Sequence, residues 1–259
     1  METQNTFPND ILSIPVIPAP AVEDKQGRHR LYKKLRSFAI YVLLSVHFYI
    51  FILKWLPVPY TLTMLQRKIS CRGCSINYQW VSYEHMSPYV KIAAVASEDQ
   101  RFPSHWGIDW EAVRQAYREN QWRKKRGLPL RGGSSISQQV AKNVFLWQGG
   151  GYFRKALEVY FTYAIEFIWG KQRILEVYLN VAETGPRCFG VEAAARRYFH
   201  KPARKLNLYE SALLIAGLPN PIRWNPGRPS AWLYRRQQHI IRQVHLLGGY
   251  AYLRDLRRF

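Results

Sequence analysis

An almost continuous apolar stretch near the N-terminus constrains this chain more than any other feature. Residues 38–53 read FAIYVLLSVHFYIFIL, in which only Ser45 and His47 are polar. With its flanking residues, the stretch reaches the roughly 17–25 residues that a helix needs to cross a bilayer. We therefore expect a transmembrane helix over residues 37–56. A buried core helix is the alternative.

Basic residues lie mainly before this stretch, and they predict its orientation. Arg and Lys side chains near the end of a spanning helix favour the cytoplasmic side. We expect a basic cytoplasmic tail over residues 1–36, whose first twenty-odd residues are proline-rich and disordered. Everything after Pro57 is then exported.

The charge balance limits the classes of partner. The chain has 38 Lys and Arg against 17 Asp and Glu, a net charge of +21, which predicts attraction to nucleic acid, anionic lipid or phosphorylated substrate. Charge alone does not distinguish these partners. The expected membrane helix favours anionic membrane lipid, and we expect no nucleic acid partner.

The exported part is expected to form a juxtamembrane segment over residues 57–82 and one mainly α-helical domain over residues 83–259. Helix signals recur along this domain, among them Ser87-Pro88 and Asp109 as helix starts and Asn207 with Glu210 as a capping box. The helices are expected at 89–98, 110–120, 136–147, 152–169, 171–182, 191–199, 208–216 and 231–247. Either Ser134 or Ser135 begins the third of them, and a short strand is expected near 76–80.

Cys71 and Cys74 are three residues apart in the expected exported part. They are suited to a short disulfide, because exported proteins fold under oxidising conditions. A zinc site would require a second pair of ligands at suitable spacing, and the sequence offers none. The alternative is a cysteine pair without a function.

Two adjacent acids end the first helix of the domain. Glu98 lies at the negative end of that helix and beside Asp99, and both features oppose ionisation of its carboxyl group. A carboxyl group of this kind is suited to act as a general base near neutral pH. Phe102 and His105 are candidates to wall or orient such a site. Two solvated acids at a helix end are the alternative.

Two further clusters carry candidate binding groups. The stretch RGGSSISQQVAKN, residues 131–143, places glycines and serines at a helix start, where backbone N–H groups bind anions. Gln138, Gln139 and Lys142 share one side of that helix. On the helix 152–169, Arg154 and Glu158 extend the apolar stripe, and a buried charged pair needs partners or a task. A plain ion pair one helical turn apart is the alternative.

Together the clusters fit a transfer reaction better than hydrolysis. Hydrolysing a glycoside needs an acid that protonates a poor leaving group. A diphosphate leaves as an anion, which fixed cations such as Lys142 and Arg154 stabilise. One carboxylate base then suffices.

Five ordered motifs resemble the peptidoglycan glycosyltransferases of glycosyltransferase family fifty-one, in particular its monofunctional members. The resemblance covers roughly residues 83–228. The motifs are EDxxFxxHxG at Glu98 to Gly107, GGSSISQQ at Gly132 to Gln139, RKxxE at Arg154 to Glu158, RILEVYLN at Arg173 to Asn180, and FGVEAAARRYF at Phe189 to Phe199. Serine replaces threonine at two positions of the second motif.

The resemblance implies a lysozyme-like helical fold and an inverting enzyme that polymerises lipid II into β-1,4-linked strands. It implies that Glu98 deprotonates the acceptor hydroxyl and that Lys142 and Arg154 hold the donor diphosphate. Glu158 acts near the leaving group, orienting cations or a divalent metal such as Mg²⁺; no other cofactor is expected. The remaining substrate-binding candidates are Asp99, Phe102, His105, Ser134, Gln138, Gln139 and Lys155.

The resemblance also implies a place in the cell and a set of partners. The protein is expected to span the bacterial inner membrane once, with its catalytic domain in the periplasm. Its partners are lipid II, the growing glycan strand and proteins of cell-wall synthesis or division. The sequence contains neither an S-x-x-K nor a K-T-G pattern, so no transpeptidase activity is expected.

One position departs from the family pattern. Many relatives have an arginine four residues before the RK motif, where this chain has Gly150. One diphosphate contact is therefore missing or comes from elsewhere, with Arg131 and Lys155 as candidates. A lytic peptidoglycan hydrolase and a non-catalytic membrane-tethered scaffold are the alternative functions.

Overall fold

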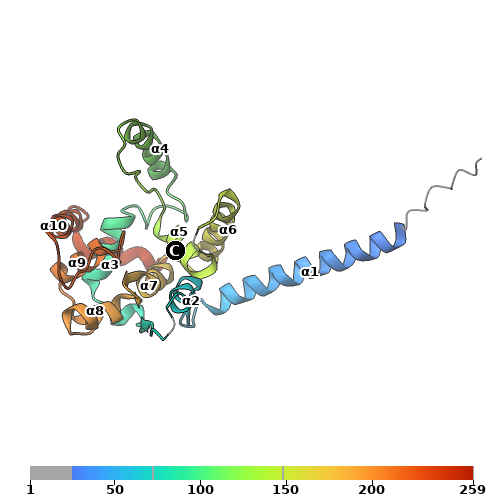
Figure 1. Cartoon of the computed structure of the whole chain (residues 1–259), viewed down its shortest axis with the longest axis horizontal. Coiled ribbons are helices and arrows are strands. Elements are labelled where there is room, and N and C mark those ends of the chain that lie inside the picture. The colour runs from blue at the N-terminus through green and yellow to red at the C-terminus, as the bar shows by residue number, and fades with distance from the viewer. Residues whose placement is uncertain (1–24, 72, 148, 259) are drawn as a thin grey trace, which may run out of the picture. The chain divides into compact units, whose positions relative to one another are not determined.

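A computed structural model describes residues 25–71, 73–147 and 149–258 of the 259-residue chain (Figure 1). The chain divides into two compact units, residues 1–45 and residues 46–259. The predicted disordered tail over the first twenty-odd residues lies outside the described residues. The described residues are mainly helical, as the sequence predicts.

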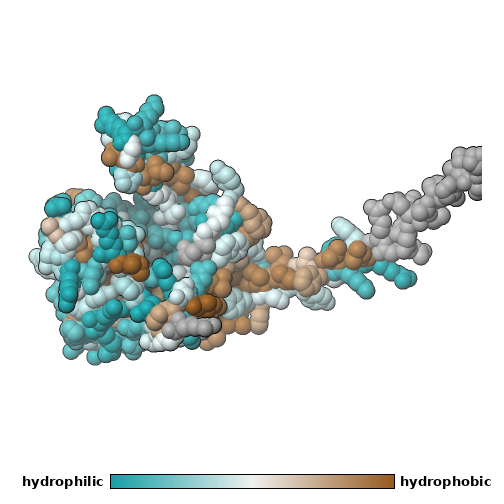
Figure 2. Space-filling model, in the orientation of Figure 1, coloured by the Kyte–Doolittle hydropathy of each residue, from teal (hydrophilic) through white to brown (hydrophobic). Residues whose placement is uncertain are grey.

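The first helix, α1, runs from Lys25 to Ile52. Its residues 29–52 are long and apolar enough to cross a membrane, and Figure 2 shows a hydrophobic surface along it. The helix begins earlier than the predicted residue 37, because the basic segment before the apolar stretch consists mostly of good helix formers. It ends four residues before the predicted residue 56. Pro57 disfavours helical backbone at the residue that precedes it.

The remaining helices belong to the second unit. They are α2 (Leu62–Ile69), α3 (Pro88–Glu98), α4 (Trp110–Lys125), α5 (Ile136–Phe145), α6 (Tyr152–Trp169), α7 (Lys171–Val181), α8 (Val191–Phe199), α9 (Leu208–Gly217) and α10 (Ala231–Leu246). Short 3₁₀ helices occur at Tyr83–His85, Ala203–Lys205 and Gly249–Arg258. The helix α2 lies within the predicted juxtamembrane segment, residues 57–82, for which no helix was predicted.

A small sheet completes the second unit. Its strands are β1 (Asn77–Tyr78), β2 (Glu183–Gly185) and β3 (Cys188–Phe189), in the order β1-β3-β2. β1 is parallel to β3, with Asn77 opposite Cys188, and β2 is antiparallel to β3. The sheet therefore joins the segment that follows α2 to the turn between α7 and α8.

The predicted helix starts are confirmed where a cap was expected. The Ser87 side chain accepts a hydrogen bond from the Tyr89 N–H, and Asp109 accepts from the first turn of α4. Asn207 forms a capping box at α9. Of the two serines proposed for α5, Ser135 is the cap. Satisfying otherwise unpaired backbone N–H groups fixes where each helix begins.

Two groups of packed helices form the core of the domain. α5 packs against α6 and α7, while α3 packs against α9 and α10 (Figure 1). Tyr178, Phe102, Phe189, Ile92 and Ile136 are among the fully buried side chains of this core. The arrangement brings the C-terminal end of α3 beside α5. α4 projects from the body of the domain (Figure 1).

The C-terminal end of α1 and the residues just after it are attached to the junction of α6 and α7. The Trp169 indole N–H donates to the Ile50 carbonyl oxygen at 2.7 Å. The Arg173 guanidinium donates to the carbonyl oxygens of Leu53, at 2.8 Å, and Leu56. These bonds satisfy backbone acceptors at the helix end that have no partner within the helix.

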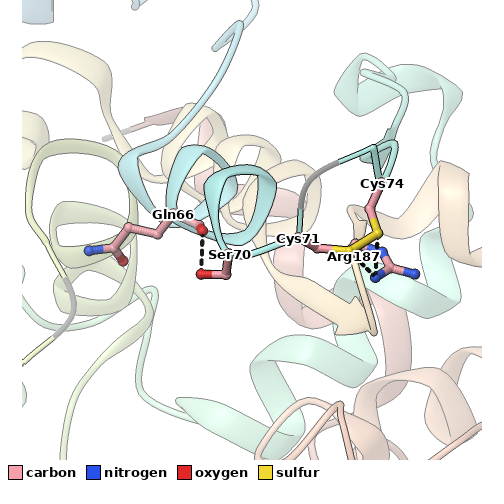
Figure 3. Close-up of a disulfide and its surroundings, with 5 residues drawn as sticks. All are labelled: Gln66, Ser70, Cys71, Cys74 and Arg187. Carbon is pink, nitrogen blue, oxygen red and sulfur yellow. Dashed lines mark hydrogen bonds between the residues drawn. A yellow bond between two sulfur atoms is a disulfide. The ribbon is translucent and has the colours of Figure 1, made fainter.

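Cys71 and Cys74 form a disulfide just after α2 (Figure 3). Of the two alternatives drawn from the sequence, the structure therefore contains the disulfide. Arg187, between β2 and β3, places its Nη1 3.2 Å from the Cys74 sulfur and 3.5 Å from the Cys71 sulfur. The third cysteine, Cys188, is free and buried. The disulfide lies where α2 meets the small sheet.

Replacing both Cys71 and Cys74 by serine should lower the free energy of unfolding by about 1–2 kcal/mol, because a short closed loop restricts the unfolded chain modestly. Thermal unfolding of the full chain in detergent, with and without dithiothreitol, measures this effect. The reductant should lower the midpoint of the unmodified protein and leave that of the double variant unchanged. An equal shift in both proteins would contradict a stabilising disulfide.

Candidate active site

Glu98 is the last residue of α3, and its carboxylate is held from two sides. Oε1 accepts a hydrogen bond from the Ser97 hydroxyl at 3.2 Å, and Oε2 accepts one from the Gln139 amide of α5 at 3.2 Å. The Glu98 side chain remains 15% exposed. It borders a cavity of about 260 Å³ whose lining includes Ser134 and Arg131. Glu98 is therefore oriented and accessible.

Asp99 has a different environment from Glu98. Its buried carboxylate accepts hydrogen bonds from the Ile136 N–H and from His105 Nε2, each at 3.0 Å. A carboxylate at a helix N-terminus is stabilised by the unpaired N–H groups and the helix dipole. Asp99 thus connects the end of α3 to the start of α5.

Phe102 and His105 support this connection from within the core. Phe102 is fully buried and the His105 side chain is 6% exposed. Asp99, Phe102 and His105 were predicted as substrate-binding residues. In the structure all three side chains are largely buried, and Asp99 lies in the lining of the cavity that Glu98 borders. Their contact with substrate stays a prediction.

The glycine of the first motif, Gly107, allows α6 to approach closely. Its φ is +72°, and a Cβ at this position would lie 2.8 Å from the Thr162 methyl group. The Gly107 carbonyl oxygen accepts a hydrogen bond from the Ser135 hydroxyl. Only glycine combines this backbone conformation with this contact. The motif therefore aligns α3, α5 and α6.

A buried ion pair joins α6 and α7, and a serine of α5 contacts it. Lys171 Nζ lies 2.7 Å from Glu166 Oε1, which also accepts a hydrogen bond of 2.5 Å from Ser137. Both charged side chains are 5% exposed. Burial lowers the pKa of Lys171, and the Glu166 charge acts in the opposite direction. The pair needs each partner, because an unpaired charge is costly in the interior.

Lys171→Ala should lower the free energy of unfolding by about 3–5 kcal/mol, because the Glu166 carboxylate would stay buried without its cation. For a domain of this size, the expected fall in the unfolding midpoint is roughly 6–20 °C. Thermal unfolding in detergent measures it, with Lys124→Ala on exposed α4 as the matched control. Equal midpoints for the two variants would contradict the argument.

Some polar side chains of the second motif cap α5, and others line a cavity. Gln138 is buried and donates and accepts within the capping box with Ser135. The prediction that Gln138 binds substrate stays a prediction, and its observed contact is this helix cap. Ser134 is exposed and borders the cavity beside Glu98. Gln139 and Lys142 line a larger cavity of about 720 Å³.

Three cationic side chains gather around one buried carboxylate. Glu158 is 2% exposed and accepts from Arg154 Nη1 at 2.9 Å and from Lys155 Nζ at 2.5 Å. Arg154 Nε is buried and has no hydrogen-bond partner among the described residues. We call Lys142, Arg154, Lys155 and Glu158 the cationic cluster.

Lys142 interacts electrostatically with the other members of the cationic cluster. Burial lowers the pKa of Lys142. The Glu158 charge raises it, and the Arg154 and Lys155 charges lower it further. A partly desolvated cation interacts strongly with an arriving anion. The cluster is therefore suited to bind a phosphate or diphosphate group.

Gly150, the position at which the family resemblance led us to expect an arginine, lies against this cluster. Its φ is +104°, and a Cβ would lie 3.1 Å from the Arg154 Cβ and 3.3 Å from the Trp147 indole nitrogen. A side chain here would need a strained backbone and would displace its neighbours. The two candidates for the missing contact are both paired, Arg131 with a glutamate of α4 and Lys155 with Glu158.

One wall of the larger cavity was not predicted from the sequence. It is formed by α2 and the residue that follows it, which contribute Thr63, Gln66, Arg67, Ile69 and Ser70 to the lining. The Arg67 guanidinium lies 3.0 Å from a carboxylate oxygen of Glu183. The Thr61 cap and the apolar spacing of Leu62, Leu65 and Ile69 are the signals that would have indicated this helix.

α5 connects the two halves of the site. Gln139 donates to Glu98, and Lys142, one turn further along the same face of α5, belongs to the cationic cluster. Gln139 and Lys142 line the same cavity. The carboxylate of Glu98 on α3 and the predicted anion-binding residues of α6 are therefore linked through one face of α5. This arrangement combines a proton acceptor with an anion site.

The described residues contain no group of three or more His, Cys, Asp or Glu side chains placed to hold a metal ion. Glu158, the residue proposed to orient a divalent metal, uses its oxygens to accept from Arg154 and Lys155. A cation with these two neighbours would be repelled. The surroundings of Glu158 therefore do not fit a Mg²⁺ ion.

Comparison with known proteins defines the class. A family model described as transglycosylase matches residues 66–245. The chain belongs to this transglycosylase family. The chain is also similar to two proteins named biosynthetic peptidoglycan transglycosylase. The one from Pasteurella multocida is 48% identical over 229 residues, which cover 86% of this chain and 90% of the relative. The one from Pectobacterium carotovorum is 49% identical over 211 residues, covering 79% and 85% respectively.

Proposed function

We propose that this protein is a peptidoglycan glycosyltransferase that polymerises lipid II into β-1,4-linked glycan strands during cell-wall synthesis and releases undecaprenyl diphosphate. The observation that carries the proposal is that Gln139, which donates to Glu98, and Lys142 of the cationic cluster share one face of α5 and line one cavity. Family membership and the names of the relatives support it.

The mechanism has one proton transfer and one displacement. Glu98 accepts the proton of the acceptor sugar 4-hydroxyl, whose oxygen attacks the anomeric carbon of the donor. The new C–O bond forms as the bond to the diphosphate breaks on the opposite face, which inverts the anomeric carbon. The bonding electrons leave with the diphosphate. Lys142 and Arg154 stabilise its charge.

The other polar residues bind or position the reactants. Ser134 and Gln139 border the two cavities and are proposed to contact substrate. Lys155 contributes further positive charge at the donor diphosphate. Glu158 holds the side chains of Arg154 and Lys155 in place through its two carboxylate oxygens. It acts on the reaction through those cations.

The proposed location is the bacterial inner membrane, crossed once by α1, with the N-terminus in the cytoplasm and the catalytic domain in the periplasm. The length and hydropathy of residues 29–52 and the basic residues at the start of α1 support this topology. A reporter fused after Phe259 should be active only in the periplasm. Activity in the cytoplasm would overturn the orientation.

We further propose that the enzyme is monofunctional. The transglycosylase match occupies residues 66–245, and the 259 residues contain none of the penicillin-binding patterns S-x-x-K and K-T-G. A labelled penicillin should therefore not acylate the purified protein. Covalent labelling would contradict this part of the proposal.

Purified full-length protein given lipid II tests the reaction itself. A glycan polymer with release of the lipid diphosphate is the expected product. Cleavage of preformed glycan would indicate a lytic hydrolase, and no turnover of either substrate would indicate a scaffold. Running the assay with Mg²⁺ and with a chelator measures metal dependence; the proposed mechanism predicts polymer in both.

A further inference from the structure

Arg236, in the last long helix α10, contacts the end of α3 that carries Glu98. Its Nη2 lies 3.7 Å from Glu98 Oε1 and 3.5 Å from the Ser97 hydroxyl oxygen. The same hydroxyl donates to Glu98 Oε1 at 3.2 Å. Ser97 therefore bridges the guanidinium and the carboxylate, accepting from one and donating to the other.

The Arg236 side chain is fixed by its surroundings. It is 31% exposed, and its Nε is buried without a hydrogen-bond partner among the described residues. Its guanidinium lies 5.9 Å from the Trp232 ring centre, and Trp232 stacks on Trp224 at 3.9 Å. Leaving Nε unpaired in the interior is unfavourable. The attraction between the guanidinium and the Glu98 carboxylate offsets this cost.

α10 is also attached to α3 at a second point. The Gln100 amide, just beyond α3, donates to the Gln243 side chain at 3.0 Å and to the Ala96 carbonyl oxygen at 3.1 Å. Gln243 lies seven residues after Arg236, two turns along the same face of α10. The helix is therefore held in register with the end of α3.

The charged and titratable groups that face Glu98 come from three elements. Asp99 follows it at the end of α3, Arg236 reaches it from α10, and the buried hydroxyl of Tyr178 approaches from α7. Burial raises the pKa of Tyr178 well above its usual value, so the phenol is neutral near physiological pH. Arg101 and Arg131 line the cavity that Glu98 borders but pair with glutamates of α4, whereas Arg236 lies 3.7 Å from the Glu98 carboxylate.

We propose that Arg236 is a positioning residue for Glu98: it holds Oε1 together with Ser97, while Gln139 holds Oε2. This inference rests on the proposed function, in which Glu98 accepts the proton of the acceptor hydroxyl. The guanidinium and the Ser97 hydroxyl together fix the direction of the carboxylate. The residue acts through Glu98 and needs no contact with the reacting atoms.

Arg236→Gln tests the proposal in full-length protein with lipid II as substrate. The rate constant kcat should fall roughly 10–100-fold, because a carboxylate that points away from the acceptor hydroxyl accepts its proton less efficiently. Arg236→Lys keeps a donor and a positive charge at this position and should restore part of the lost kcat. KM for lipid II should change less than kcat.

Arg235→Gln is the matched control, because Arg235 is the exposed neighbour on the same helix. A purely structural role for Arg236 would lower the unfolding midpoint and change kcat and KM together, without rescue by Arg236→Lys. That result, or a rate equal to that of Arg235→Gln, would overturn the inference. Absence of polymer from the unmodified protein would instead overturn the proposed function.

Discussion

Glu98→Gln should reduce lipid II polymerisation on the order of 10²–10⁴-fold, the usual contribution of a general base. The amide cannot accept the proton of the attacking hydroxyl. It can still occupy the same space between Ser97 and Gln139. The substitution therefore removes the chemistry while keeping the local packing.

The unfolding midpoint and the rate of polymer formation should be measured on the same preparation. Glu111→Gln is the matched control, because Glu111 is an exposed acid whose side chain is 75% accessible. The midpoint should change little in either variant, and only Glu98→Gln should lose activity. Substantial residual turnover in the folded Glu98→Gln protein would exclude Glu98 as the base.

Lys142→Ala should reduce kcat on the order of 10²–10³-fold, by analogy with removing a donor that stabilises developing negative charge. The loss should exceed that of Lys155→Ala, because the Lys155 side chain is 45% exposed and its charge is better screened by water. Separate measurements of kcat and KM at saturating acceptor distinguish the donor site from the acceptor site.

The pH dependence supplies a second test of Lys142. Burial lowers the pKa of this lysine, so its charge is lost at lower pH than that of an ordinary lysine. Activity should therefore decline on the alkaline side, and Lys142→Arg should weaken that decline because arginine stays protonated. Lys124→Ala, on exposed α4, is the control. A change in acceptor KM alone would contradict the placement of Lys142 at the donor diphosphate.

The sequence predicted the helices of the domain and the main chemical groups because both depend on short-range patterns. Ser87, Asp109 and Asn207 were identified as caps from local chemistry alone, and the structure confirms each. The mainly helical fold and the long apolar helix follow from periodicity and hydropathy in the same way.

The sequence did not predict which motif residues face inward. Asp99 and Gln138 have the same polar chemistry as Glu98 and Gln139, yet the first pair is used in helix connections and capping. That division depends on how α3 and α5 meet, which no local pattern encodes. Arg236 was missed for the same reason, since it reaches Glu98 from 138 residues further along the chain.

The composition of the cationic cluster has a consequence for turnover. Three cations surround one buried carboxylate, which leaves a net charge of three minus one, or plus two, among Lys142, Arg154, Lys155 and Glu158. Without the Glu158 carboxylate, the three cations would bind the departing lipid diphosphate at least as tightly as they bind the diphosphate of the substrate. Binding both equally well slows product departure without speeding the reaction. In the proposed mechanism, Glu158 lowers the net positive charge that holds the diphosphate, so that the lipid diphosphate can leave before the next lipid II binds.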